Sequence, residues 1–178
     1  MNTGRKVIRV IRITILACLV IFFIVKQLTT TPNSAKIAQQ FLSIDDPLPA
    51  GWEYAGGMDV GLVKNCTIKN AGTSDRVVVA LYAEPPSKKR VKAKDMATNS
   101  LTGKSTIESS GQDVIAGQTM YYNRGMRHMG KMDIPFQMGY LNTPSGRLVT
   151  IEVFEPSVKT YDPQVVKPIL DHIKGFKI

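Results

Sequence analysis

An uncharged apolar run near the N-terminus constrains this chain most. Thirteen residues after Arg12, ITILACLVIFFIV, carry no charge, and the first 34 residues contain no acidic residue. At 1.5 Å per residue the run is about 20 Å long, against about 30 Å for the hydrocarbon layer of a bilayer. It is therefore a targeting or anchoring segment. Any folded domain has to come from the roughly 140 residues that follow, which are enough for one hydrophobic core.

Two interpretations of this segment remain open. A cleavable signal peptide has an apolar core of about this length, but no good A-x-A-like cleavage pattern follows the run. An uncleaved anchor from about Val7 to Leu28 would let Arg9, Arg12 and Lys26 extend their charges to the membrane interfaces. We favour the anchor.

Both interpretations predict the same topology. Five basic residues flank the apolar run, so the N-terminus stays in the cytoplasm and residues 35–178 are exported. We expect a cytoplasmic basic arm and transmembrane anchor in residues 1–28, a polar stalk in residues 29–47 and an extracytoplasmic domain in residues 48–178. The predicted location is the inner membrane of a bacterial cell, crossed once, with the C-terminal domain on the periplasmic side.

Charge and cysteine content limit the function classes. The net charge is +9, but five of these charges belong to the N-terminal segment, so the exported part has little of the basic excess that nucleic-acid binding needs. We predict no nucleic-acid partner. Cys66 is the only exported cysteine, which excludes an intrachain disulfide. Alternation in GLVKNCTIKN places Leu62, Cys66 and Ile68 on one face, which predicts a buried thiol.

Most of the exported part has the pattern of strands separated by turns such as NAGTSD and NTPSG. The predicted strands are Trp52–Tyr54, Leu62–Lys69, Arg76–Ala83, Thr106–Ser109, Gln118–Arg127, Ile134–Leu141 and Arg147–Phe154. Two of them, containing VVVALYA and LVTIEVF, are almost continuously apolar, which indicates that both of their faces are covered.

Helices are available for that covering. The last segment offers Asp162 as N-cap, Pro163 at the first helical position and Gly175 just past the end, with Pro168 as an interior helix breaker. A second helix is predicted from about Lys92 to Leu101. One or two helical turns are expected within the stalk, around residues 35–42.

The runs PLPAGWEY, GQTMYYNRG and GRLVTIEVFEPSVKTYDPQVVKPILDHIKGF together resemble the PsbP-like family, over about residues 47–178. The resemblance implies an α+β fold in which an antiparallel β-sheet of about six strands is sandwiched between helices; here one N-terminal transmembrane helix would precede it. Members of that family mostly assist or stabilise assemblies. The resemblance supplies no catalytic motif to transfer to this chain.

The stretch GMRHMGKMD raises a metal-binding hypothesis, because thioether and imidazole ligands suit Cu(I). Gly130-Lys131 is a good two-residue hairpin turn. With that turn, Met129 faces Met132, while His128 and Asp133 pair on the opposite face together with Met126. We therefore expect adaptable methionines at a sheet rim, and the Cu(I) site through Met126, Met129 and Met132 is the minority hypothesis.

Enzyme signatures are weak. Two histidines and one exported cysteine supply neither a histidine-rich zinc site nor a Cys-His pair, and TGKST lacks the first glycine of a phosphate-binding loop. We therefore predict no catalytic residues, no metal and no cofactor. A deep pocket that contains His128 with Arg124 or Asp133 would instead favour an enzyme with a site that the sequence does not reveal.

The densest charge is KKRVKAK, with Lys88, Lys89, Arg90, Lys92 and Lys94. A solvated loop that leads into the second helix is the simpler interpretation. Alternatively, the five cations contact anionic lipid head groups or an acidic protein, because the stalk holds the domain near the bilayer. Taken together, the sequence predicts a membrane-anchored extracytoplasmic binding or assembly-accessory domain that is not catalytic and has a protein partner.

Overall fold

A computed structural model describes residues 34–59, 64–70, 78–84, 91–99, 105–156 and 159–178. The chain divides after Thr31 into two units, and every described residue belongs to the second, Pro32–Ile178. In chain order the elements are α2 (Ser34–Phe41), β1 (Leu42–Ile44), β2 (Trp52–Asp59), β3 (Lys64–Asn70), β4 (Val78–Ala83), α3 (Ala93–Asn99), β5 (Ser105–Ile115), β6 (Gln118–Met129), β7 (Met132–Asn142), β8 (Leu148–Phe154), α4 (Pro163–His172) and β9 (Ile173–Phe176).

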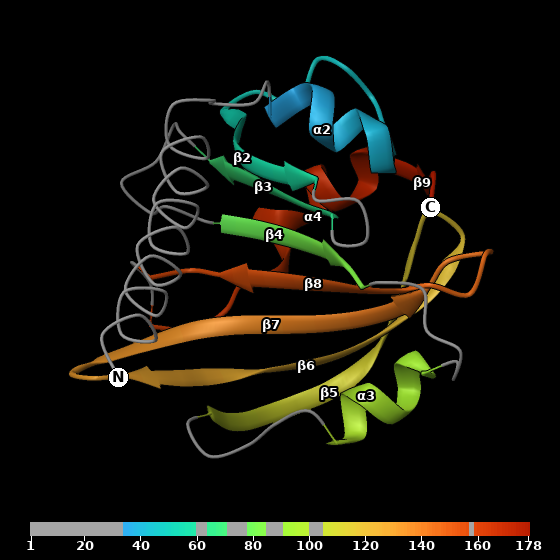
Figure 1. Ribbon diagram of the computed structural model, residues 1–178. Helices are drawn as coiled ribbons and strands as arrows, with labels where there is room; N and C mark the ends of the chain where they lie inside the picture. The colour runs from blue at the N-terminus through green and yellow to red at the C-terminus, as the bar shows by residue number, and fades with distance from the viewer. Residues whose placement is uncertain (1–33, 60–63, 71–77, 85–90, 100–104, 157–158) are drawn as a thin grey trace, which may run out of the picture. The chain divides into compact units, whose positions relative to one another are not determined.

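The central element is an antiparallel sheet of seven strands in the order β2-β3-β4-β8-β7-β6-β5, which can be followed from β2 at the top of Figure 1 to β5 at the bottom. Each pair of neighbours is antiparallel. A separate two-stranded sheet joins β1 to β9. The prediction of an α+β fold with a large antiparallel sheet is confirmed, with seven strands in place of about six.

One face of the sheet carries the larger hydrophobic core. Alternate residues of the central strands, such as Leu81 and Ile151, pack there with Phe41 of α2 and Ile169 of α4, and all four side chains are fully buried. Continuous apolar strands are expected where both faces are covered. Cys66 lies in this core, as the alternation of β3 predicts.

The other face carries a smaller core. Phe136, Met138 and Tyr140 alternate along β7 and pack with Ala93 of α3 and Leu148 of β8. The side-chain amide of Asn142 fixes the start of α3, because its Oδ1 accepts a hydrogen bond from the Ala93 N–H at 2.9 Å and its Nδ2 donates one to the Val91 carbonyl at 3.0 Å.

The last helix begins as the sequence predicts and ends earlier. Asp162 is the N-cap, its carboxylate accepts the Gln164 N–H at 2.9 Å, and Pro163 opens the helix. Helix α4 continues through Pro168 but stops at His172. The prediction that Gly175 follows the helix end is wrong, because Ile173–Phe176 forms β9 and pairs with β1.

The expected stalk contains structure that packs into the domain. The helical turns predicted around residues 35–42 form as α2, and Ala38, Phe41 and Leu42 are fully buried. Ser34–Ile44 of the expected stalk therefore pack against the core of the domain. Hydrophobic burial of these three side chains favours docking over an extended tether.

No helix in the described ranges is long and apolar enough to cross a membrane. The predicted anchor in residues 1–28 lies outside those ranges.

Candidate functional site

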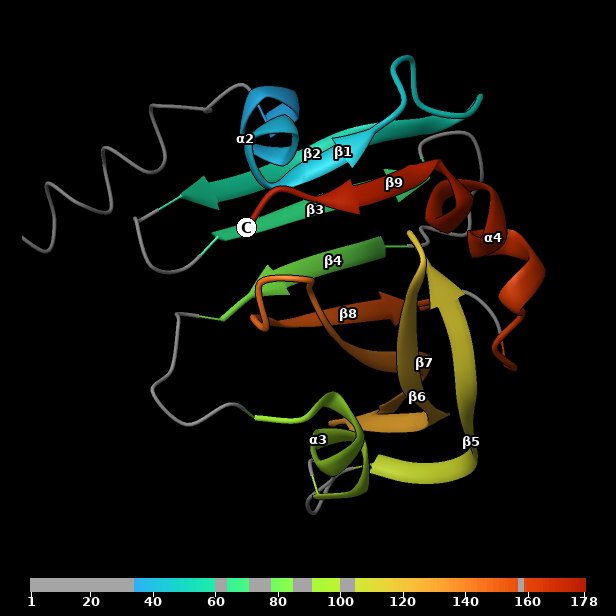
Figure 2. The same ribbon diagram turned by 90° about the vertical axis from the view of Figure 1, so that its right-hand side faces the viewer.

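The strands β5 and β6 form the last ribbon of the seven-stranded sheet. They pair over ten residues with one register shift between Ile107 and Ser109. Strand β5 starts beside α3 and curves upward to end close to α4 (Figure 2). Its side chains are exposed along nearly the whole length from Thr106 to Val114.

A groove of about 740 Å³ lies between this ribbon and α3. We call it the α3 groove. Its volume falls within the range of about 300–1,000 Å³ that is usual for ligand pockets. It is lined by residues of α3, β5 and β6, namely Lys94, Ala97, Thr98, Ile107, Ser110, Gly111, Gln112, Tyr121, Tyr122 and Asn123.

Asn123 holds the groove together. Its side chain is 4% exposed, its Nδ2 donates a hydrogen bond to the Ala97 carbonyl at 2.6 Å, and its Oδ1 accepts one from the Ser110 hydroxyl at 2.5 Å. A buried amide with both ends bonded fixes the elements that it joins. Asn123 therefore sets the separation of α3 from the ribbon, and the polar groups of the groove keep a defined geometry.

The outer edge of β5 is open in the part of the chain that the structure describes. Strand β6 is its one pairing partner there, and no backbone hydrogen bond outside the regular strands involves β5. Two apolar side chains are exposed on it, Ile107 at 37% and Val114 at 65%. An edge of this kind presents unpaired N–H and C=O groups to any extended chain.

The methionines are placed as the hairpin argument predicts. Met129 pairs with Met132 next to the Gly130 turn, where φ is 65°. His128 pairs with Asp133 and Met126 with Pro135, so Met126 lies on the opposite face from Met129 and Met132. The hairpin does not bring the three thioethers together. Among the described residues no cluster of His, Cys, Asp and Glu suits a metal ion.

His128 connects three strands at the exposed end of the sheet. Its Nδ1 lies 2.6 Å from Asp133 Oδ1 on β7, and its Nε2 lies 3.1 Å from Thr106 Oγ1 on β5. The order of hydroxyl, imidazole and carboxylate is that of a nucleophile triad. However, the side chains of His128 and Asp133 are 49% and 63% exposed, and His128 does not line the α3 groove. The deep histidine pocket that would favour an enzyme is not formed there.

The remaining candidates are dispersed. The thiol of Cys66 is fully buried, and burial raises its pKa to about 12, so it is a core side chain and a poor nucleophile. Lys92 and Lys94 of the basic stretch are exposed, and Lys94 reaches the α3 groove. Lys88, Lys89 and Arg90 lie outside the described residues.

Sequence reasoning did not identify the α3 groove. Tyr121 and Asn123 appear in the GQTMYYNRG run, but a period of two only places them on one face and does not reveal that α3 covers it. Comparison of the chain with family models, with curated proteins and with solved structures found no match.

Proposed function

We propose that this chain is a membrane-tethered, extracytoplasmic binding or assembly module without a catalytic role, and that it binds an extended segment of a partner protein along β5. The observation that carries the proposal is the exposed edge strand of 11 residues beside the α3 groove. Addition of a strand to a sheet edge is a common mode of peptide recognition, because the main chain supplies affinity and side-chain pockets supply specificity.

The sequence of β5 suits this role. Native proteins usually protect an exposed edge with charged side chains, above all lysine, or with proline; STIESSGQDVI has neither lysine nor proline, and its two charges are the carboxylates Glu108 and Asp113. Each edge strand has one register shift, but the other end of the sheet differs because α2 packs against β2. Of the two edge strands, β5 is therefore the better acceptor for an added strand.

The α3 groove indicates what the segment carries. Ala97, Ile107 and Tyr121 offer apolar surface for one side chain, while the exposed Lys94 favours an acidic residue next to it. We infer an extended segment with an apolar and an acidic residue. Anionic lipid at the basic stretch is the competing occupant of this region.

The proposed membrane tether is inferred from the basic, apolar N-terminal sequence. The relationship to PsbP-like proteins is also part of the proposal. The packing of helix side chains into cores on both faces of an antiparallel sheet supports the α+β sandwich that the resemblance implies. An assembly role would agree with what most members of that family do.

Site-specific photo-cross-linking in cells tests the proposal. We expect a photoreactive residue in place of Gln112, which lines the groove, to give a discrete protein adduct. The same residue in place of the exposed Glu53, on the opposite edge strand, is expected to give none.

A matched pair of lysine substitutions sharpens the test. Ile107→Lys places a charge on the β5 edge and should abolish the adduct, because an edge lysine blocks strand addition. Val165→Lys changes a side chain of equal exposure on α4, 38% against 37%, and should leave the adduct intact. Equal adducts from both variants, or capture of lipid alone, would contradict the proposal.

A further inference from the structure

A second cavity lies on the opposite face of the ribbon from the α3 groove. Its volume is about 230 Å³, and we call it the Arg124 cavity. It lies between α4 and the end of β5, with Arg124 and Gln137 contributed by the paired positions of β6 and β7. The lining also includes Asp113, Tyr161, Lys167 and Asp171, together with apolar side chains of β5 and α4.

The guanidinium of Arg124 is held in place before any ligand arrives. Its Nε donates a hydrogen bond to Gln137 Oε1 at 2.7 Å, and Gln137 is only 2% exposed. Its Cζ lies 4.1 Å from the ring centroid of Tyr122 and 5.3 Å from that of Tyr161. Stacking on the two tyrosine rings and the hydrogen bond from Nε fix the orientation of the guanidinium. Little conformational entropy is therefore lost when it binds an anion.

The same guanidinium makes no direct ion pair in the described part of the chain. Within the described ranges no carboxylate forms an ion pair with Arg124, and no acceptor bonds to its terminal nitrogens. The hydroxyl of Tyr161, another residue of this cavity, is buried without a hydrogen-bond partner among those residues. Buried polar groups are normally paired, so this hydroxyl points to a missing acceptor, and the half-buried guanidinium of Arg124 lies beside the same ring.

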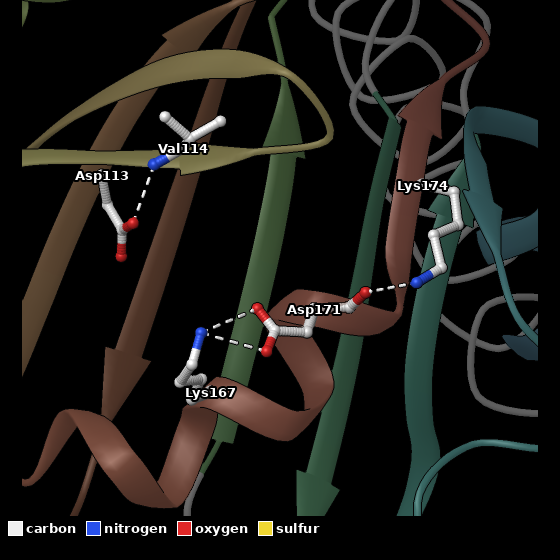
Figure 3. A network of polar contacts seen from close by, with 5 residues as sticks. All are labelled: Asp113, Val114, Lys167, Asp171 and Lys174. Carbon is white, nitrogen blue, oxygen red and sulfur yellow. Dashed lines mark hydrogen bonds and ion pairs between the residues drawn. The ribbon is translucent and has the colours of Figure 1, made fainter.

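The rim of the cavity limits the charge of that acceptor. Lys167 Nζ lies 3.1 Å from Asp171 Oδ2 and 3.2 Å from its Oδ1, so this cation is already neutralised (Figure 3). Asp113 adds a second carboxylate, whose Oδ1 accepts the Val114 N–H at 2.8 Å. The lining holds two cations and two carboxylates, a balance that disfavours a dianion such as phosphate and leaves Arg124 as the group that could bind a monoanion.

Apolar side chains complete the enclosure. Ile115, Val166 and Leu170 line the cavity and are at most 8% exposed. A volume of 230 Å³ is below the usual range for drug-sized ligands, so the ligand is small.

We propose that the Arg124 cavity binds a short-chain organic monocarboxylate. The carboxylate accepts parallel hydrogen bonds from the terminal nitrogens of Arg124 and one from the Tyr161 hydroxyl, while the aliphatic chain packs against Ile115, Val166 and Leu170. The inference does not rest on the protein partner, because neither Arg124 nor Tyr161 lines the α3 groove, although Tyr122 lines that groove and also stacks on Arg124.

Nuclear magnetic resonance tests the proposal. The isotope-labelled full chain is titrated with butyrate in detergent micelles. We expect saturable shifts of the Arg124 Nε–H and the Gln137 side-chain amide. Arg124→Gln should weaken binding about tenfold, because it removes charge-assisted hydrogen bonds. Arg124→Lys keeps the positive charge but lacks the parallel donors of a guanidinium, so it should lose less affinity for butyrate than Arg124→Gln. It also serves as a second variant if Arg124→Gln does not fold.

The matched control is Arg127→Gln. Arg127 lies on the same strand but on the other face, with its Cζ 5.2 Å and 5.0 Å from the ring centroids of Phe136 and Phe154. This variant should bind butyrate as the parent does. Three results would overturn the proposal. They are a shift of the same resonances by inorganic phosphate at the same concentration, the absence of a saturable shift with butyrate, and unchanged butyrate binding by both Arg124 variants.

Discussion

At the scale of single residues, Glu155 is the clearest source of pH-dependent stability. Its side chain is 2% exposed, Oε2 accepts the Asp162 N–H at 3.1 Å, and Oε1 is buried without a partner in the described part of the chain. Burial raises the pKa of this carboxyl above its ordinary 4.5, although the hydrogen bond from Asp162 opposes the shift. The folded state therefore holds this proton more tightly than the unfolded state does.

The sign of the effect follows from linkage. Because the folded pKa is raised, the contribution of Glu155 to stability is fully present below the unfolded pKa and is lost as pH rises through the folded pKa. We expect Glu155→Gln, which can still accept the Asp162 N–H, to raise the melting temperature at pH 7 and to give little gain near pH 4. Thermal unfolding of the full chain at several pH values measures this difference. The exposed Glu108→Gln is the control, and an equal gain at both pH values for Glu155→Gln would contradict the account.

The surroundings of some residues could be predicted from local sequence signals, and those of others could not. The burial of Cys66 and the pairing of His128 with Asp133 follow from a period of two and from a turn that wants glycine, both of which are local signals. The environment of Arg124 carries no local signal. Its partners Gln137 and Tyr161 are 13 and 37 positions away and become neighbours only when β7 and the start of α4 pack against β6.

At the scale of elements, the closest packing between β5 and β6 depends on Gly125. A Cβ at this position would collide with the backbone carbonyl oxygen of Thr106, which cannot move without the strand. We expect Gly125→Ala to lower the free energy of unfolding by about 1–3 kcal/mol through overpacking. Urea denaturation, followed by the fluorescence of Trp52, the only tryptophan, measures the loss.

Gly56→Ala provides the matched strand control. A Cβ there would meet nothing within 4 Å, so the change should stay within about 0.5 kcal/mol. Equal stability of the Gly125 and Gly56 variants would show that the β5–β6 ribbon is not packed as described.

Elements that begin at a clear capping residue could be predicted from the sequence. Elements whose limits depend on pairing with a distant strand could not. The start of α4 follows from Asp162 and Pro163, whereas its end at His172 depends on the pairing of β9 with β1. Strand β5 was expected only over Thr106–Ser109, because an exposed edge strand has no alternation of apolar and polar residues to mark its full length of 11 residues.

At the scale of the whole molecule, the proposed function joins two features: an N-terminal segment whose sequence predicts export, and a domain whose sheet ends in an open strand beside a groove. The charge distribution fits this division, because five of the 23 basic residues lie within the first 26 positions and no acidic residue does. If the domain is exported, its partner protein is in the same compartment as β5 and the α3 groove. The export claim is thus the one on which the partner proposal depends.

A reporter enzyme fused after Ile178 tests that claim directly. Alkaline phosphatase, which is active only after export, should be active in this fusion, and a reporter that works only in the cytoplasm should be silent at the same position. The opposite pair of activities would place the domain inside the cell and contradict the proposed extracytoplasmic role.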